Sequence, residues 1–406
     1  MSLLLKIKNR LRLVSSSIFD RTLYSFTTHQ TNPAPPTFTV YYIGENLPPR
    51  MARIVKWLKR FYPIRAVLLC HQDGYAPLFS NNSFDEVLLF RNKWHLLRLL
   101  NQQPLPHVVH AFGPKSFYPD VARLFYSGKA KFIYDMQDVL AIYYGLQAPI
   151  QWFRNEFPHE KNCLQFADGL VSHGLEPIPA SKLYHISQKK NRIFFPLLCD
   201  DDVLVNNPKP LTLENISVVY AGEIQGKNRD SKQFGNVQFF HLAEKFGAQK
   251  VHFHVYATPH SYLLYGDEYR EVEKQNPYFH LHAPVAQKDL PAELSKYHFG
   301  IIPFFESYTA LRHDKNYYST SLKLFNFIEA GIPILVSEDI GFQNWMACRY
   351  SAGISITEAD LSSIRQKIET IDYPALIKGL IQSRPKLSLK NNIYRIKNLY
   401  DKVCAQ

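Results

Sequence analysis

A short segment in the second half of the chain places hydroxyl, ammonium and amide side chains at the start of one apolar helix. Ser319, Thr320 and Ser321 supply three hydroxyls just before the helix. Lys323 falls in its first turn, and Asn326 lies three residues further along on the same face. The free amides of a helix start attract anions, and the helix dipole disfavours a cation there. The pattern indicates a site for a negative ligand such as a diphosphate; the alternative is a capped helix with one solvated lysine.

Two aspartates follow a strand-like run in the first half of the chain. Asp135 and Asp138 come after "KFIY", at the carboxyl end of the expected strand. A carboxylate there can accept the proton of an acceptor hydroxyl, and Asp138, which lies further into the loop, is the preferred base. An N-cap for a helix near 139–145 is the alternative role. His110 ends another strand, where it could orient an acceptor or be a buried core histidine.

Charged residues also follow strand-like runs in the second half. Glu223, Lys227 and Arg229 come after Gly222, which ends the run "VVYAG", and Glu306 comes after "GIIPFF". Each could contact a nucleotide or its diphosphate, and each could equally be a solvated loop charge. The run "DDD" at 200–202 has no neighbouring histidine, so no metal site is predicted there.

Composition limits the class of protein. The chain has 406 residues, of which 46% are hydrophobic, so we expect two globular domains. Five scattered cysteines without a C-x-x-C pair favour a reducing, cytoplasmic compartment. The net charge of +12 suits an anionic partner. No zinc-finger or RNP signature is present, and no nucleic-acid partner is predicted.

The first 37 residues form an N-terminal extension with a basic amphipathic segment. Five apolar residues share one helical face and four cations flank it: Leu4, Ile7, Leu11, Val14 and Ile18, with Lys6, Lys8, Arg10 and Arg12. Such a segment can lie on an anionic membrane surface, here the inner face of the membrane. The alternative is an ordinary surface helix or a disordered start. No apolar run approaches the roughly 18 residues that cross a bilayer, and no signal peptide is expected.

Short apolar runs alternate with helical patterns in both halves of the chain, which predicts an α/β fold with two tandem Rossmann-like domains. We expect an acceptor-side domain at 38–200, a linker at 201–215, a donor domain at 216–380 and a C-terminal helix at 381–406. Ligands of such sheets bind beyond the carboxyl ends of the strands, so the two domains should face each other across a cleft. G-x-G-x-x-G and Walker A patterns are absent, which counts against dinucleotide enzymes and P-loop NTPases.

The segment "KLFNFIEAGIP", from Lys323 to Pro333, resembles the "K-L-F-E-Y-L-A-x-G-x-P" segment of GT-B glycosyltransferases of the family-four-like group. "VVYAGEIQGKNRD", "FGIIPF", "HVVHAFGP" and "KFIYDMQD" are similar to other family strands and loops in the same order. The resemblance implies transfer of a sugar from a nucleotide-sugar to a carbohydrate or lipid-linked acceptor. The nucleotide-sugar is a substrate, and neither a metal nor a cofactor is expected. It implies donor contacts from the residues singled out above, catalytic Asp138 or Asp135, and acceptor contacts near Gly44, His110 and Gly113.

One departure bears on mechanism. The family commonly carries two glutamates eight positions apart, and Tyr318 and Asn326 occupy these positions here. A retaining mechanism is therefore in doubt. Two other classes stay open: a sugar-nucleotide epimerase or hydrolase, and a non-catalytic partner with a degenerate site.

Overall fold

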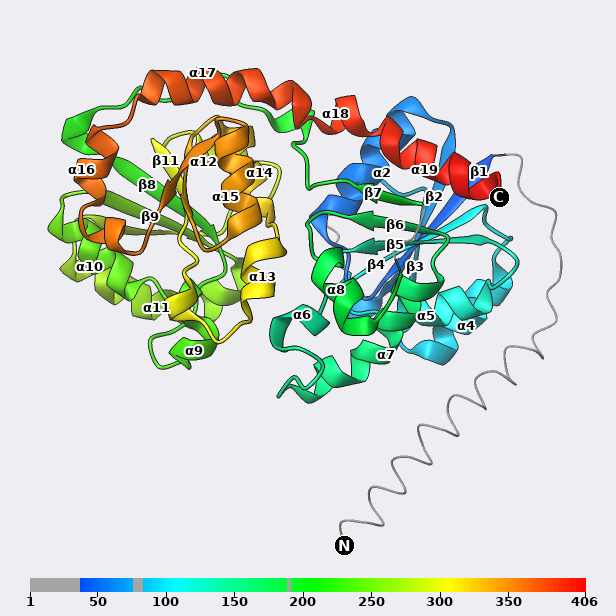
Figure 1. Cartoon of the computed structure of the whole chain (residues 1–406). Coiled ribbons are helices and arrows are strands. Elements are labelled where there is room, and N and C mark those ends of the chain that lie inside the picture. Colours follow the sequence, from blue (N-terminus) through cyan, green and yellow to red (C-terminus); the bar gives the residue numbers. More distant parts are fainter. Residues whose placement is uncertain (1–36, 76–82, 188–190) are drawn as a thin grey trace, which may run out of the picture.

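The computed structural model describes residues 37–75, 83–187 and 191–406, which form two α/β domains side by side (Figure 1). The basic amphipathic segment lies outside these residues. In the described part of the chain, no helix has both the length and the apolarity to cross a bilayer.

The first domain is built on a parallel seven-stranded sheet in the order β3-β2-β1-β4-β5-β6-β7. Its central strands are buried on both faces, as the sequence "VVHAFG" of β4 predicts. The strands are β1 (Phe38–Gly44), β2 (Ile64–His71), β3 (Glu86–Phe90), β4 (Val108–Gly113), β5 (Lys131–Met136), β6 (Gly169–Ser172) and β7 (Arg192–Phe194). The helices between them are α2 (Pro49–Phe61), α4 (Lys93–Gln102), α5 (Phe117–Phe125), α6 (Ala141–Tyr144), α7 (Gln151–Phe166) and α8 (Pro177–Tyr184).

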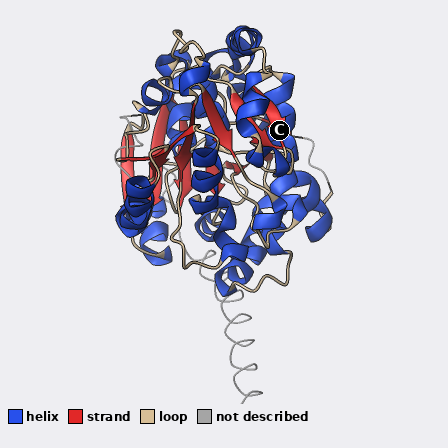
Figure 2. Cartoon of the chain, turned by 90° about the vertical axis from the view of Figure 1, so that its left-hand side faces the viewer, coloured by secondary structure: helices blue, strands red, loops and turns tan. Residues whose placement is uncertain are grey.

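The second domain repeats this plan with a parallel six-stranded sheet in the order β10-β9-β8-β11-β12-β13. Figure 2 shows its strands between helices on both sides. The strands are β8 (Ser217–Gly222), β9 (His252–Ala257), β10 (Phe279–His282), β11 (Phe299–Ile302), β12 (Ile334–Ser337) and β13 (Gly353–Ile356). The helices are α9 (Ser231–Phe234), α10 (Phe240–Ala248), α11 (Pro259–Gln275), α12 (Leu290–Leu294), α13 (His313–Tyr318), α14 (Leu322–Ala330), α15 (Gly341–Arg349), α16 (Ile364–Glu369) and α17 (Tyr373–Ser383).

The final residues form more than one helix. A 3-10 turn that contains Pro385 separates α17 from α18 (Leu389–Asn392) and α19 (Tyr394–Cys404), because proline interrupts a helix. The chain thereby returns to the first domain, and α19 packs there (Figure 1). The Tyr400 hydroxyl lies 3.1 Å from that of Tyr42 on β1. The apolar residues that recur at helical spacing in this segment are all buried: Leu389, Ile393, Ile396, Tyr400 and Val403.

The chain thus crosses between the domains twice, and the two crossings are bonded to each other. Cys199 pairs with Ser388 in an isolated parallel bridge. The amide of Cys199 donates to the carbonyl of Leu387 at 2.7 Å, and the amide of Leu389 donates to the carbonyl of Cys199 at 2.9 Å. The predicted linker 201–215 holds only two short 3-10 turns.

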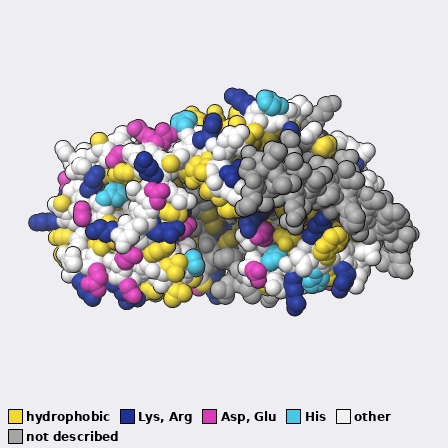
Figure 3. Space-filling view, turned by 90° about the horizontal axis from the view of Figure 1, so that it is seen from below, with side chains coloured by type: hydrophobic (Ala, Val, Ile, Leu, Met, Phe, Trp, Pro, Cys, Tyr) yellow, Lys and Arg dark blue, Asp and Glu magenta, His cyan; other side chains and the backbone are white. Residues whose placement is uncertain are grey.

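The surface is hollowed between the domains in the space-filling view (Figure 3). A cavity of about 200 Å³ is lined by residues from both, including Arg53 of α2 and Gln287, which follows β10. Arg53 also forms a buried ion pair with Glu329 of α14, at 2.7 Å. The two domains therefore meet through a charged contact between helices α2 and α14, beside the cavity between them.

Candidate active site

A cavity of about 850 Å³ opens at the carboxyl ends of β8 and β9 and at the start of α14. This is where a parallel sheet binds ligands, because loops and helix amides converge there. It is large enough for a drug-sized ligand. Its walls combine apolar side chains with a few polar groups: Gly222, Glu223, Tyr256, Thr258, Val285, Gln287, Lys288, Lys323 and Asn326 are among them.

The hydroxyls before α14 do not cap its amides, which corrects the capping expected from the sequence. Ser321 occupies the N-cap position without a side-chain cap, and its hydroxyl donates to Oε1 of Gln343 at 2.8 Å. The Ser319 hydroxyl donates to Glu176 of the first domain at 2.5 Å. Thr320 Oγ1 is buried with no hydrogen-bond partner among the described residues. No side chain of the described residues caps the start of α14, so an anionic ligand can bind its amides.

Lys323 lies at this helix start and lines the cavity. Its Nζ atom is 5.1 Å and 5.5 Å from the ring centroids of Phe304 and Tyr220, and it has no ion-pair partner in the described part of the chain. Burial lowers the pKa of Lys323 to about 8, against the opposing charges of Glu223 and Asp138. A buried lysine that contacts aromatic rings and has no carboxylate in an ion pair with it can bind an anionic ligand, which is the role predicted from the sequence.

Because Gly222 has no side chain, the side chain of Lys323 can pass beside its Cα atom. Its φ is +153°, which side chains rarely adopt, and a Cβ there would lie 2.5 Å from Cε of Lys323. The glycine at the end of β8 is therefore required by backbone conformation and by the path of the lysine.

Asn326 lines the same cavity and is held by a residue that sequence reasoning missed. Its Oδ1 atom accepts a hydrogen bond from Nε2 of Gln287 at 3.0 Å. Gln287 follows β10 in a proline-containing loop, and no local pattern marks it as a partner of a helix 39 residues away. This pair occupies the place where the resembling family has a glutamate.

Asp138 projects from the first domain toward the second. Its φ of +115° lies outside the usual regions, and its carboxylate lies 2.5 Å from Nζ of Lys315 on α13. Burial would raise the pKa of Asp138, but Lys315 and His173 outweigh it and hold that pKa below its usual value. Helix α6 begins at Ala141 without a side-chain cap, so Asp138 is not its N-cap. An unusual backbone conformation beside a cleft is typical of functional sites.

Glu176 joins the same group and was not singled out from the sequence. Its carboxylate accepts from Lys315 Nζ at 3.0 Å, from the Ser319 hydroxyl and from the amide of Val139 at 3.3 Å. The side chain is 2% exposed, so this carboxylate depends on these donors. Asp138 and Glu176 raise the pKa of Lys315 well above its usual value, although burial opposes this.

Asp135 is placed differently from the prediction, whereas His110 takes the second of its two predicted roles, that of a buried core histidine. Asp135 lies inside β5, fully buried and ion-paired with Arg50 of α2, so it does not face the cleft. His110 Nδ1 is 2.6 Å from the Tyr400 hydroxyl, also in the core. Burial would raise the pKa of Asp135, but Arg50 and His110 hold it below its usual value. The structure therefore corrects the assignment of Asp135, which connects β5 to α2, and agrees with a core role for His110, which connects β4 to α19.

Other predicted residues also lie away from the cavity. The Lys227 amide donates to Glu268 at 2.8 Å, the Arg229 guanidinium stacks on Phe234 at 4.7 Å, and Glu306 pairs with His313 at 2.5 Å. None of the three lines the cavity of about 850 Å³, so the contacts that they make are those of ordinary loop residues.

The predicted acceptor-side glycines allow tight packing. A Cβ on Gly44 would lie 2.3 Å from the ring of Phe112, and one on Gly113 would lie 3.1 Å from the carbonyl oxygen of Lys115. Their positions at the ends of β1 and β4 agree with the prediction, but these neighbours explain each glycine without a ligand.

Comparisons with known proteins agree with this arrangement. Residues 234–392 match the family model described as the glucosyltransferase 3-like C-terminal domain. A search of curated proteins by sequence finds no match. Sucrose-phosphate synthase from Thermosynechococcus elongatus superposes with a TM-score of 0.64 at 9% identity, over 90% of this chain and 99% of that chain. The fold is GT-B.

Two further structures share the GT-B fold. Anabaena HepE in complex with UDP has a TM-score of 0.63 and 10% identity, over 91% of this chain and 100% of that chain. A UDP-N-acetylglucosamine 2-epimerase from Listeria monocytogenes has a TM-score of 0.55 and 12% identity, over 90% and 97%. The predicted fold and the resemblance to GT-B glycosyltransferases are confirmed; at these identities the structures show the fold alone.

Proposed function

We propose that the protein is a metal-independent glycosyltransferase that moves a sugar from a nucleoside-diphosphate sugar to an acceptor hydroxyl. The observation that carries the proposal is Lys323, a cation without a carboxylate partner among the described residues, at a helix start in a cavity of about 850 Å³. The match to a glucosyltransferase 3-like domain over residues 234–392, which contain this lysine, supports it.

In the proposed reaction the bond between the sugar's anomeric carbon and the diphosphate oxygen breaks, and a bond from that carbon to the acceptor oxygen forms. Lys323 and the amides of α14 stabilise the charge that develops on the leaving diphosphate. Asp138 accepts the hydroxyl proton. Its carboxylate is ionised at neutral pH because Lys315 holds its pKa low, so the group is in the form that a base requires.

Titration calorimetry with UDP, GDP and dTDP tests the donor site. One of these nucleotides should bind, and Lys323→Ala should weaken that binding. Lys227→Ala is the matched control, because Lys227 lies in the same domain but outside the cavity. If none of the three nucleotides binds, the glycosyltransferase proposal falls and a non-catalytic partner is favoured.

A sugar-nucleotide epimerase or hydrolase is the second candidate, because a UDP-N-acetylglucosamine 2-epimerase shares the fold. The two are separated by incubating the protein with the nucleotide-sugar that it binds. An epimerised or hydrolysed sugar formed without acceptor favours this candidate. A product that appears only when a sugar acceptor is added favours the transferase.

The proposed acceptor is a carbohydrate or lipid-linked precursor of a surface polysaccharide or glycolipid, used at the cytoplasmic face of a membrane. The four cations of the N-terminal segment support this, since each contributes about 1 kcal/mol near an anionic surface. Deleting residues 2–19 should release the protein from anionic vesicles, and salt should weaken binding of the full chain. If the full-length chain does not bind such vesicles at low salt, the proposed membrane association is wrong, and the proposed transferase activity is not affected.

A further inference from the structure

Four histidines lie on one face of the two neighbouring strands at the edge of the second sheet. Strand β9 carries His252 and His254, and β10 carries His280 and His282. Residues two apart on a strand share a face, and the parallel register sets His280 opposite His254. The H-x-H pattern in both strands is visible in the sequence, but only the pairing of β9 with β10 brings the imidazoles together.

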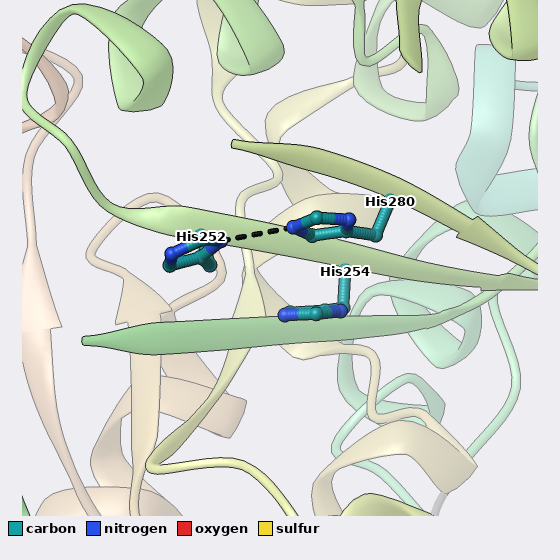
Figure 4. Close-up of side chains that lie close together, drawn as sticks. All are labelled: His252, His254 and His280. Carbon is teal, nitrogen blue, oxygen red and sulfur yellow. Dashed lines mark hydrogen bonds between the residues drawn. The ribbon is translucent and has the colours of Figure 1, made fainter. Parts of the chain in front are cut away.

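Three of these imidazoles lie close enough to hold one ion (Figure 4). One nitrogen from each of His252, His254 and His280 lies within 4.8 Å of the others. His252 Nδ1 is 2.9 Å from His280 Nε2, and the His254 and His280 rings stack at 4.4 Å. All three are partly exposed, so an ion can reach them from solvent.

A second layer of contacts orients one of the rings. His254 Nδ1 lies 3.0 Å from Nε2 of His282, which is also 3.2 Å from the Tyr297 hydroxyl. When Nδ1 of His254 donates this hydrogen bond, its Nε2 carries the free lone pair. Outer contacts of this kind are typical of histidines that bind metals.

We propose that His252, His254 and His280 bind one borderline divalent transition-metal ion of the Zn²⁺ or Ni²⁺ class. Nitrogen-only sites favour these ions over Mg²⁺ and Ca²⁺, which take oxygen ligands. Tetrahedral ligands about 2.0–2.1 Å from zinc lie about 3.3 Å apart. The His252–His280 hydrogen bond therefore opens on binding, and the stacked His254 ring turns so that its lone pair points at the ion.

The bound ion would tie β9 to the edge strand β10. Both strands lead into the donor cavity, through Tyr256 in β9 and Thr258 directly after it, and through Val285 and Gln287 after β10. The site is structural in this proposal, and it does not depend on the proposed transferase activity.

The test uses the full chain without a polyhistidine tag, stripped with a chelator and titrated with ZnCl₂, NiCl₂ or MgCl₂ in a calorimeter. Zn²⁺ and Ni²⁺ should bind with one-to-one stoichiometry and raise the melting temperature, and Mg²⁺ should not. His252→Gln and His280→Gln should each weaken binding by tenfold or more, and His282→Gln by less. His260→Gln on α11 is the control, because His260 is exposed in the same domain but outside the cluster.

Two results would overturn the site. One is the absence of one-to-one binding of Zn²⁺ or Ni²⁺. The other is unchanged binding in a variant that combines His252→Gln, His254→Gln and His280→Gln. If the variants fail to fold, Co²⁺ added to the wild-type chain decides. A visible d–d absorption band, with loss of the His252–His280 hydrogen bond in imidazole NMR spectra, supports the assignment. An unchanged spectrum of these rings rejects it.

Discussion

Lys315 of the second domain reaches Asp138 of the first, with 2.5 Å between Nζ and Oδ1. The same ammonium group lies 3.0 Å from Glu176 and 4.4 Å from the ring centroid of Tyr143. One cation therefore pairs with two carboxylates of the opposite domain and joins the proposed base to the domain interface.

Replacing Lys315 by methionine should destabilise the protein, because the buried carboxyl group of Glu176 would lose its cation. Breaking a buried pair costs about 3–5 kcal/mol, and partial exposure of Asp138 places the expected loss near the lower end. Urea unfolding measures it. Lys232→Met is the control, because Lys232 is exposed in the same domain. If both variants unfold at the same urea concentration, the network does not stabilise the fold.

Asp138→Asn should abolish turnover and leave nucleotide binding intact, because the amide keeps the shape and removes the basic oxygen. Asp135→Asn should act differently. It leaves Arg50 buried without its carboxylate, and we expect a loss of about 3–5 kcal/mol in the free energy of unfolding. Turnover assays and urea unfolding of both variants separate the two roles. Near-normal turnover in Asp138→Asn would place the base elsewhere or indicate a retaining mechanism.

Nucleotide affinity should fall as the pH rises through about 8. The pKa of Lys323 is lowered to about 8 in the free protein, so the cation is present below that pH and is lost above it. The second phosphate pKa is near 6, so the charge of the nucleotide stays constant in this window. Calorimetry between pH 7 and 9 should show up to about a tenfold loss, within the 1.5–3 kcal/mol of a charge-assisted contact.

Lys323→Ala gives the control for this pH dependence. The variant should bind the nucleotide more weakly at pH 7 and show little further change up to pH 9. An equal pH dependence in both proteins would assign the titration to another group.

Gly222→Ala should reduce both stability and nucleotide affinity. The methyl group would lie 2.5 Å from Cε of Lys323, and a φ of +153° is strained for alanine by about 1–3 kcal/mol. Thermal unfolding and calorimetry measure the two effects. Gly128→Ala is a useful comparison, because Gly128 also has a positive φ of +72° but nothing within 4 Å of its Cβ position. If only stability falls in Gly222→Ala, the lysine can take another path to the ligand.

The sequence predicted those features that depend on local pattern. Apolar runs predicted the strands, and the cation in the first turn of α14 pointed to a helix start that lines the cavity of about 850 Å³. The network of Glu176 could not be predicted, because its partner Lys315 lies 139 residues away. Asp135 was misplaced for a related reason. The sequence pattern predicted that Asp135 follows the strand and faces the cleft, but the strand β5 includes it. Its partner Arg50 lies on a helix 85 residues earlier in the chain.

The bonded pair of crossings at Cys199 and Ser388 determines how one domain can move against the other. A single connection between two domains permits rotation in all directions. Two connections that are hydrogen-bonded to each other restrict twisting, because twisting would break the hydrogen bonds of Cys199 with Leu387 and Leu389. These two crossings therefore favour rotation of one domain against the other about a single axis over twisting.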